Sequence, residues 1–195
     1  MPLNKLDETP ALIVIDLQNA VLGLPAEPPI EDVVNRTREL ARTFRERGLP
    51  VVLVNVSGRA PGRTDAGPPK FQLKDDWTEL LPELKQHPDD YLVTKQRLGA
   101  FIGTPLHEYL RKRGVTQVVL AGVATSIGVE STARSAYDLG YNVALVVDAM
   151  ADMDQEMHRH SIEKVFPRLG ETAATADVLK LLHVASGNSE KTGEA

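Results

Sequence analysis

Short apolar runs rich in β-branched residues alternate with segments whose apolar residues recur at helical spacing, and this alternation restricts the possible folds most strongly. Five runs have the length and composition of buried strands: residues 11–16, 50–56, 91–95, 117–122 and 142–148. Nearly continuous apolar runs of this kind are typical of parallel strands that are covered on both faces. The pattern therefore predicts a doubly wound, three-layer α/β/α domain built on one parallel sheet.

Helices are predicted between these strands, and a short further strand is predicted near the end of the chain. The helical segments are residues 33–44, 104–113, 129–139, 154–166 and 178–184, and the further strand covers residues 172–175. Residues 57–74 are rich in Gly and Pro and form the longest irregular stretch. A loop of this length inside a compact domain is usually functional, and we expect this one to set the choice of substrate.

Length, charge and cysteine content narrow the class of protein. The 195 residues fit a single domain over residues 1–195, with a core over residues 8–185 and a polar tail over residues 186–195. The chain contains no cysteine, which excludes a disulfide framework, a thiolate metal site and a cysteine nucleophile. A net charge of −5 and a pI near 5.6 give no general attraction to nucleic acid or to anionic membranes.

The sequence shows no targeting or nucleotide-binding signal. No apolar run reaches the about 18 residues that a membrane-spanning helix needs, and residues 1–10 do not resemble a secretion signal. We therefore expect a cytoplasmic protein with no membrane partner. No Gly-x-Gly-x-x-Gly motif follows the first strand and no phosphate-binding loop is present, so no nucleotide cofactor is expected.

Polar side chains follow the ends of several predicted strands. Asp16 ends the first strand with Gln18 close behind it, Lys95 ends the third, and Asp148 ends the fifth. Residues 123–128 lead from the fourth strand into a helix. Because the carboxyl ends of parallel strands share one edge of a sheet, a carboxylate, an ammonium group and a helix start can meet there.

Each of these polar residues also has an ordinary structural explanation. An Asp after a strand often caps a turn, and this is the better interpretation of Asp148. Thr125 and Ser126 can form a plain helix N-cap. His158 and His160 lie two residues apart on a predicted helix and therefore face different directions, so we expect them at the surface rather than as joint metal ligands.

Three motifs together resemble the isochorismatase-like hydrolase superfamily over about residues 8–183. They are Ala-Leu-Ile-Val-Ile-Asp-Leu-Gln at 11–18, Thr-Lys at 94–95, and Gly-Val-Ala-Thr-Ser-Ile-Gly-Val-Glu-Ser-Thr-Ala-Arg at 122–134. The resemblance implies a six-stranded parallel sheet and a catalytic site made from Asp16, Lys95 and the residue at position 128. It also implies a non-proline cis peptide between Val123 and Ala124. The candidate substrate-binding residues are Gln18, Ala124, Thr125 and Ser126.

The sequence departs from most of the superfamily at position 128, where Gly128 stands in place of the usual cysteine nucleophile. Amidase chemistry through a thioester is therefore excluded. Nicotinamidase-like members carry metal-binding histidines after the second strand, but residues 56–67 contain no His, so no metal is expected. Isochorismatases also have Gly here and hydrolyse a vinyl ether without a nucleophile, although their usual Tyr-Ala-His differs from residues 124–126. Residues 127–134 look most similar to a Gly-bearing branch of bacterial isochorismatase-family proteins.

Three functional hypotheses remain open at this point. In the first, the chain is a hydrolase of a small, anionic metabolite, with Asp16 as general acid or general base beside Lys95. In the second, the chain is inactive and binds a metabolite in the same pocket. In the third, Ser126 or Thr125 is the nucleophile. A nearby Lys95 lowers the pKa of Asp16, which favours a base, whereas burial raises it and favours an acid.

The resemblance also implies a homo-oligomer, a dimer or larger, because members of the superfamily usually associate. Apolar residues in the loop after the first strand and on the helix after the fourth can face a partner. They include Leu22, Leu24 and Tyr137.

Overall fold

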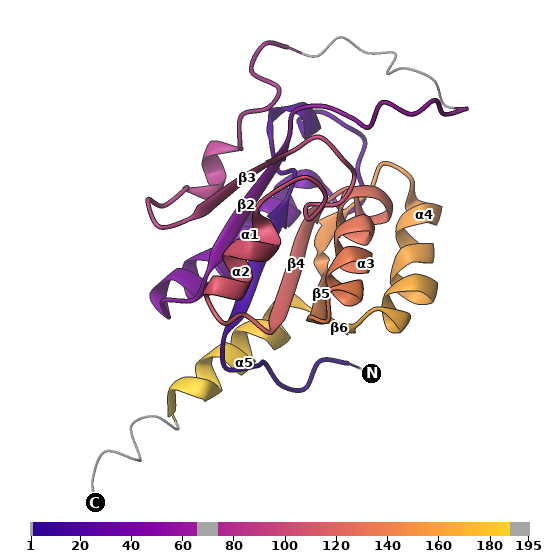
Figure 1. Cartoon of the computed structure of the whole chain (residues 1–195). Coiled ribbons are helices and arrows are strands. Elements are labelled where there is room, and N and C mark those ends of the chain that lie inside the picture. The colour runs from indigo at the N-terminus through magenta and orange to yellow at the C-terminus, as the bar shows by residue number, and fades with distance from the viewer. Residues whose placement is uncertain (1, 66–73, 188–195) are drawn as a thin grey trace, which may run out of the picture.

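Six parallel strands form the centre of the molecule (Figure 1), whose computed structural model describes residues 2–65 and 74–187. The strands are β1 (Pro10–Ile15), β2 (Val51–Val56), β3 (Tyr91–Lys95), β4 (Gln117–Val123), β5 (Asn142–Ala151) and β6 (Glu171–Ala173). They lie in the order β3-β2-β1-β4-β5-β6, and every neighbouring pair is parallel. The prediction of a doubly wound, six-stranded α/β/α fold is thereby confirmed.

Helices cover both faces of the sheet. They are α1 (Ile30–Glu46), α2 (Leu106–Lys112), α3 (Glu130–Asp138), α4 (Gln155–His160) and α5 (Thr175–Gly187). Helices α1 and α5 pack on one face and α2 and α3 on the other, with α4 beside α3 (Figure 1). On β1, Leu12 and Val14 belong to the first of these two cores, whereas Ile13 and Ile15 belong to the second. Alternate side chains of a strand point to opposite faces, so a strand covered on both sides is apolar throughout.

The order of the strands reverses between β1 and β4. From β1 the chain continues to β2 and β3 on one side, and β4 then returns to pair with the other edge of β1. Gly122, near the end of β4, permits this pairing: its φ is +116°, and a Cβ at this position would overlap the carbonyl oxygen of Ile15. The loops that leave β1 and β4 diverge here, which is where ligands usually bind in doubly wound sheets.

The structure differs from the sequence predictions at the end of β5 and in the helix after it. Strand β5 continues beyond Asp148 to Ala151, because its pairing with β4 shifts register between Leu120 and Gly122 and then resumes at Met150. The predicted helix over residues 154–166 is α4 followed by one π-helical turn over Ser161–Val165. Residues 66–73 of the predicted loop and residues 188–195 of the predicted tail lie outside the described residues.

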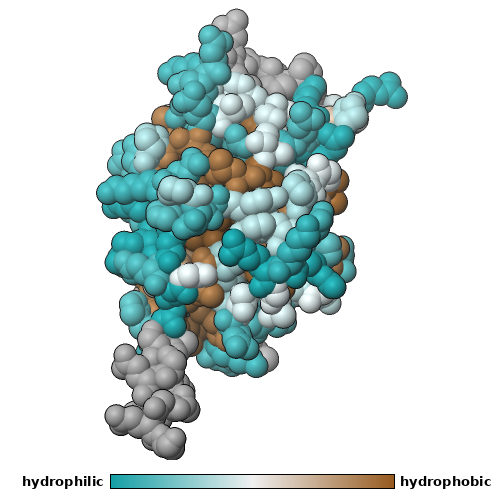
Figure 2. Space-filling view, turned by 60° about the vertical axis from the view of Figure 1, so that its left-hand side comes forward, coloured by the Kyte–Doolittle hydropathy of each residue, from teal (hydrophilic) through white to brown (hydrophobic). Residues whose placement is uncertain are grey.

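Several large hydrophobic side chains are exposed near β3, which is an edge strand of the sheet. Leu92 on β3, and Leu98 and Ile102 after it, are each more than half exposed. Figure 2 turns the β3 side of the molecule forward and shows hydrophobic residues gathered in the centre of that face, framed by hydrophilic ones. Within the described part of the chain, no helix combines the length and the apolar composition needed to cross a membrane.

Candidate active site

Asp16 and Lys95 form an ion pair at the carboxyl edge of the sheet. Asp16 directly follows β1 with a φ of +51°, a backbone conformation that is uncommon for residues other than Gly. Lys95 ends β3, and its side chain spans the width of β2 to reach the carboxylate. The distance from Lys95 Nζ to Asp16 Oδ2 is 2.6 Å, and the side chains are only 3% and 12% exposed, respectively. The ammonium group also donates a hydrogen bond to the carbonyl oxygen of Arg97, at 3.2 Å.

Two opposing effects act on the Asp16 carboxyl group. Burial disfavours its charged form and is the larger effect, whereas the charge and hydrogen bond of Lys95 favour the charged form. The result is a pKa raised to about 6. Oδ1, the second carboxylate oxygen, is buried and has no hydrogen-bond partner among the described residues. Asp16 is thus a carboxyl group that can exchange a proton near neutral pH.

Gly128 lies directly against this pair. It belongs to a single π-helical turn, Thr125–Val129, that connects β4 to α3. A Cβ at Gly128 would lie 3.3 Å from Asp16 Oδ2, 3.1 Å from the carbonyl oxygen of Val123 and 3.0 Å from Ile15 Cγ2. The structure therefore brings Asp16, Lys95 and Gly128 together, as the sequence analysis expected from the order of the strands.

A buried threonine on α3 holds this turn in place. Thr132 donates a hydrogen bond from its hydroxyl to the Gly128 carbonyl oxygen at 2.7 Å. The same hydroxyl accepts a hydrogen bond from the backbone N–H of Ala100 at 3.0 Å. Thr132 thereby connects the turn that contains Gly128 with the loop that follows Lys95.

Gln18 is fully buried and bonded to backbone groups. Its amide nitrogen donates to the carbonyl oxygens of Val56 and Trp77, and its amide oxygen accepts from the N–H of Val56. These bonds join the end of β1 to the end of β2 and to the segment around Trp77. The side chain therefore supports the site in this structure, and its direct contact with substrate stays a prediction.

Ala124, Thr125 and Ser126 lie between β4 and Gly128, after a cis peptide bond that joins Val123 to Ala124. Ala124 and Ser126 are half-buried, whereas Thr125 is fully buried. Their contact with substrate also stays a prediction.

Two residues that the sequence analysis did not select, Asp152 and His158, contact this segment. Asp152 Oδ2 accepts hydrogen bonds from the Ser126 N–H at 2.8 Å and from the Ser126 hydroxyl at 2.7 Å. The Thr125 hydroxyl lies 2.8 Å from His158 Nδ1. The expectation that His158 and His160 lie at the surface holds for His160, which is exposed, but only in part for His158, which is half-buried because α4 packs against residues 125–126.

Asp148 stands apart from the site. Its carboxylate accepts hydrogen bonds from the N–H and the hydroxyl of Thr175 at the start of α5, and Arg36 lies 3.7 Å away. The interpretation of Asp148 as a structural cap agrees with these contacts.

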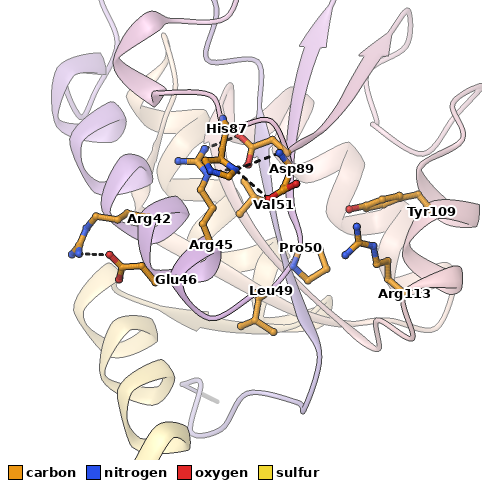
Figure 3. A pocket seen from close by; sticks show the side chains of 12 residues that line it. Arg42, Arg45, Glu46, Leu49, Pro50, Val51, His87, Asp89, Tyr109 and Arg113 are labelled. Carbon is orange, nitrogen blue, oxygen red and sulfur yellow. Dashed lines mark hydrogen bonds and ion pairs between the residues drawn. The ribbon is translucent and has the colours of Figure 1, made fainter.

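A separate pocket of about 610 Å³ lies at the opposite edge of the sheet (Figure 3). Its lining includes Val51, the first residue of β2, and Asp90, the residue before β3. Arg45 projects into this region and donates two hydrogen bonds to Asp90, at 2.9 and 2.8 Å. The pocket lies at the amino ends of the strands and does not coincide with the Asp16–Lys95 pair.

Over residues 2–65 and 74–187, no three His, Asp or Glu side chains gather in a way that could hold a metal ion.

The sheet order, with its reversal at β1 and β4, defines an α/β protein of the isochorismatase-like hydrolase fold. The Isochorismatase domain matches residues 10–177, and the chain belongs to the isochorismatase family.

Relatives cover nearly the whole chain. The uncharacterized isochorismatase family protein YecD of Escherichia coli O157:H7 is 38% identical over 182 residues, which cover 90% of this chain and 97% of YecD. The solved structure of an isochorismatase family protein from Burkholderia thailandensis is 43% identical with a TM-score of 0.87, and covers 92% of this chain and 98% of that one. The isochorismatase of Bacillus subtilis is 29% identical over 205 residues, which cover 98% of this chain and 65% of that protein.

Proposed function

We propose that the protein hydrolyses a small, anionic enol ether without a cysteine nucleophile, and that Asp16 is its general acid. The observation that carries the proposal is the state of the Asp16 carboxyl group. One oxygen is paired with Lys95, the other has no partner among the described residues, and the pKa is raised to about 6. A carboxyl group in this state still holds a proton in an appreciable fraction of molecules near neutral pH.

Enol ether hydrolysis needs a proton donor rather than a nucleophilic side chain. Asp16 donates its proton to the terminal vinyl carbon, which converts the ether into an oxocarbenium ion. Water adds to the cationic carbon, and the released proton returns to Asp16. The hemiketal then breaks into a ketone and an alcohol, so the sum is one water consumed for one ether cleaved. Lys95, 2.6 Å from Oδ2, stabilises the carboxylate that exists while the proton is on the substrate.

Gly128 fits this chemistry better than acyl transfer. The chain has no cysteine, and position 128 has no side chain to attack a carbonyl carbon. The relative from Bacillus subtilis whose name is isochorismatase supports the same class of reaction. Isochorismate is a dicarboxylate with an enol ether bond, and it is therefore the first substrate to test.

The hydroxyl groups close to Gly128 are poor nucleophiles in this structure. Thr125 is fully buried, and its hydroxyl is hydrogen-bonded to His158 Nδ1 at 2.8 Å. The Ser126 hydroxyl donates its hydrogen bond to the Asp152 carboxylate, at 2.7 Å. Both hydroxyls are thus paired with groups outside the Asp16–Lys95 pair, Thr125 with His158 and Ser126 with Asp152, so a serine- or threonine-hydrolase mechanism is less well supported than proton donation by Asp16.

The proposal is tested with purified protein and isochorismate, with released pyruvate measured through NADH oxidation by lactate dehydrogenase. We expect turnover by the wild type and a loss of about 100-fold or more in Asp16→Asn. Asp148→Asn is the matched control, because Asp148 also follows an apolar stretch and also lies near a basic residue, but caps α5 instead. Saturable binding by calorimetry without pyruvate release would overturn the hydrolase proposal and favour a metabolite-binding protein.

A further inference from the structure

We propose that His158 is a positioning residue: its imidazole, hydrogen-bonded to the buried Thr125 hydroxyl, holds the turn that carries Gly128 against the Asp16 carboxyl group. The role in turnover rests on the proposed function, whereas the role in the geometry of the site does not. The two residues lie 33 positions apart and on different elements, so no local sequence pattern connects them.

The contact satisfies a group that would otherwise be unpaired. Thr125 is fully buried, and His158 Nδ1, at 2.8 Å, is the hydrogen-bond partner of its hydroxyl among the described residues. A buried hydroxyl without a partner destabilises the folded state, so the pair fixes both the Thr125 side chain and the backbone that carries it.

The tautomer of His158 sets the direction of this hydrogen bond. A buried hydroxyl proton needs an acceptor, and the structure pairs the Thr125 hydroxyl with His158 Nδ1. When Nδ1 accepts that proton, the ring is neutral and carries its own proton on Nε2. Burial supports the neutral form because it lowers the pKa of His158, although the carboxylates of Asp152 and Glu27 act in the opposite direction.

The segment that His158 holds leads directly to the candidate active site. Thr125 begins the π-helical turn, and the carbonyl oxygen of the preceding Ala124 accepts hydrogen bonds from the N–H groups of Ile127 and Val129. Gly128 in this turn packs so closely that even a Cβ would lie 3.3 Å from Asp16 Oδ2. A shift of Thr125 therefore changes the packing around the carboxyl group and the access of water to it.

A second hydrogen bond joins the end of α4 to the segment around Gly128, and it serves as the comparison for a purely structural contact. Ser161, one residue after α4, donates a hydrogen bond from its buried hydroxyl to Glu130 Oε2 at the start of α3, at 2.7 Å. It ties the segment after α4 to the first residue of α3, whereas the His158–Thr125 bond holds the start of the turn that contains Gly128. Ser161→Ala is therefore a matched control for lost packing. His160→Ala is the control for loss of an imidazole, since His160 is exposed.

The activity experiment compares His158→Ala, His158→Asn, Thr125→Val and the double variant His158→Ala/Thr125→Val. We expect His158→Ala to lower kcat about 10- to 100-fold with little change in KM, because misplaced reacting groups slow the chemical step. Asn places an acceptor near the position of Nδ1, so His158→Asn should recover most of kcat. The double variant should be no slower than the slower single variant. Ser161→Ala and His160→Ala should leave kcat unchanged.

A second measurement does not depend on turnover. The carboxyl ¹³C shift of Asp16, followed against pH, gives the pKa of this group directly. In His158→Ala we expect this pKa to fall from about 6 toward the ordinary range, because water then reaches the loosened site, while His160→Ala leaves it unchanged. ¹⁵N spectra of the wild type should show the Nε2–H tautomer of His158, and Thr125→Val should disturb it.

The outcomes separate the two proposals. If no enol ether is hydrolysed by the wild type but the Asp16 pKa responds to His158→Ala, the proposed function fails and the positioning role stands. An unchanged Asp16 pKa in folded His158→Ala overturns the positioning role. So does an equal loss of kcat in His158→Ala and Ser161→Ala.

Discussion

Lys95 reaches across β2 and places its ammonium group 2.6 Å from Asp16 Oδ2, yet the carboxyl group still has a pKa of about 6. An ammonium group at this distance normally lowers the pKa of a carboxyl group, so burial more than cancels the effect of the lysine. The lysine thus keeps the carboxylate form accessible, and burial keeps the protonated form accessible. This balance suits a group that must give up a proton and recover it in each cycle.

The first prediction concerns the dependence of activity on pH. If Asp16 is the general acid, its protonated form is the active one, so log(kcat/KM) should fall with a slope of −1 as pH rises above about 6. In Lys95→Met the charge that lowers the Asp16 pKa is gone, so the inflection should move to higher pH. Initial rates between pH 5 and 9 check both statements. A rate that rises through pH 6 would mean that Asp16 acts as a base.

The second prediction concerns the stability of the buried pair. Lys95→Met or Asp16→Asn alone leaves one ionisable partner buried without its counterpart, which should cost about 3–5 kcal/mol of unfolding free energy. The double variant Asp16→Asn/Lys95→Met should recover most of that loss. Urea unfolding checks this cycle.

An exposed ion pair provides the control for that cycle. Arg42 and Glu46 are 2.9 Å apart on α1, with side chains that are 62% and 56% exposed, so Arg42→Ala should cost less than about 1 kcal/mol. A double variant as unstable as the sum of the two single variants would show that the partners do not compensate each other.

The sequence could predict where Asp16, Lys95 and Gly128 meet, because parallel strands put their carboxyl ends at one edge. It could not predict His158, whose partner Thr125 is 33 residues away in the chain. Asp152 was missed because the predicted strand ended at Asp148, whereas β5 continues to Ala151. The apolar residues Ala149, Met150 and Ala151 were the available signal that the strand continues.

Gln18 shows a different limit of sequence reasoning. Its position just after Asp16 suggested a contact with substrate, but its amide group bonds to backbone atoms of Val56 and Trp77. Such bonds depend on how two distant loops approach each other. No local pattern in the sequence contains that information.

The third prediction concerns Gly122, where β4 passes close to β1. A Cβ here would overlap the Ile15 carbonyl oxygen, and the φ of +116° is unfavourable for other residues. Gly122→Ala should therefore lose more than about 3 kcal/mol, measured by thermal or urea unfolding. Gly140 is the matched control: its φ is +85°, but no atom lies within 4 Å of an added Cβ. Gly140→Ala should cost only about 1–2 kcal/mol.

The fourth prediction is a homo-oligomer in solution. Leu22 and Tyr137 are 59% and 53% exposed. Leu92 on β3, and Leu98 and Ile102 after it, are also more than half exposed, and Figure 2 shows hydrophobic residues gathered on that side of the molecule. Burying such side chains against a second copy would stabilise a dimer or larger assembly. Light scattering should give at least twice the chain mass of 21.3 kDa. A mass of one chain at all concentrations would contradict the prediction.

The last prediction concerns Gly128→Cys. The new Cβ would lie 3.0 to 3.3 Å from Ile15, Val123 and Asp16, so the variant should fold but lose about 1–3 kcal/mol of stability. Gly128→Ala should lose a similar amount of stability. Because alanine adds the Cβ without a thiol, this variant measures the steric cost alone.

The thiol of Gly128→Cys reports the electrostatics of the site. The start of the helix and the nearby Lys95 ammonium both stabilise a thiolate, whereas the Asp16 carboxylate opposes it. With Lys95 and the helix start acting together, we expect alkylation by iodoacetamide at pH 7 to be faster than that of free cysteine. It should slow in a Lys95→Met background and accelerate in an Asp16→Asn background. The wild-type chain has no cysteine, so all label incorporation measured by mass spectrometry comes from position 128. A thiol that reacts at the rate of free cysteine in all three backgrounds would show that neither charge acts on this position, and would count against an anion-stabilising site next to Gly128.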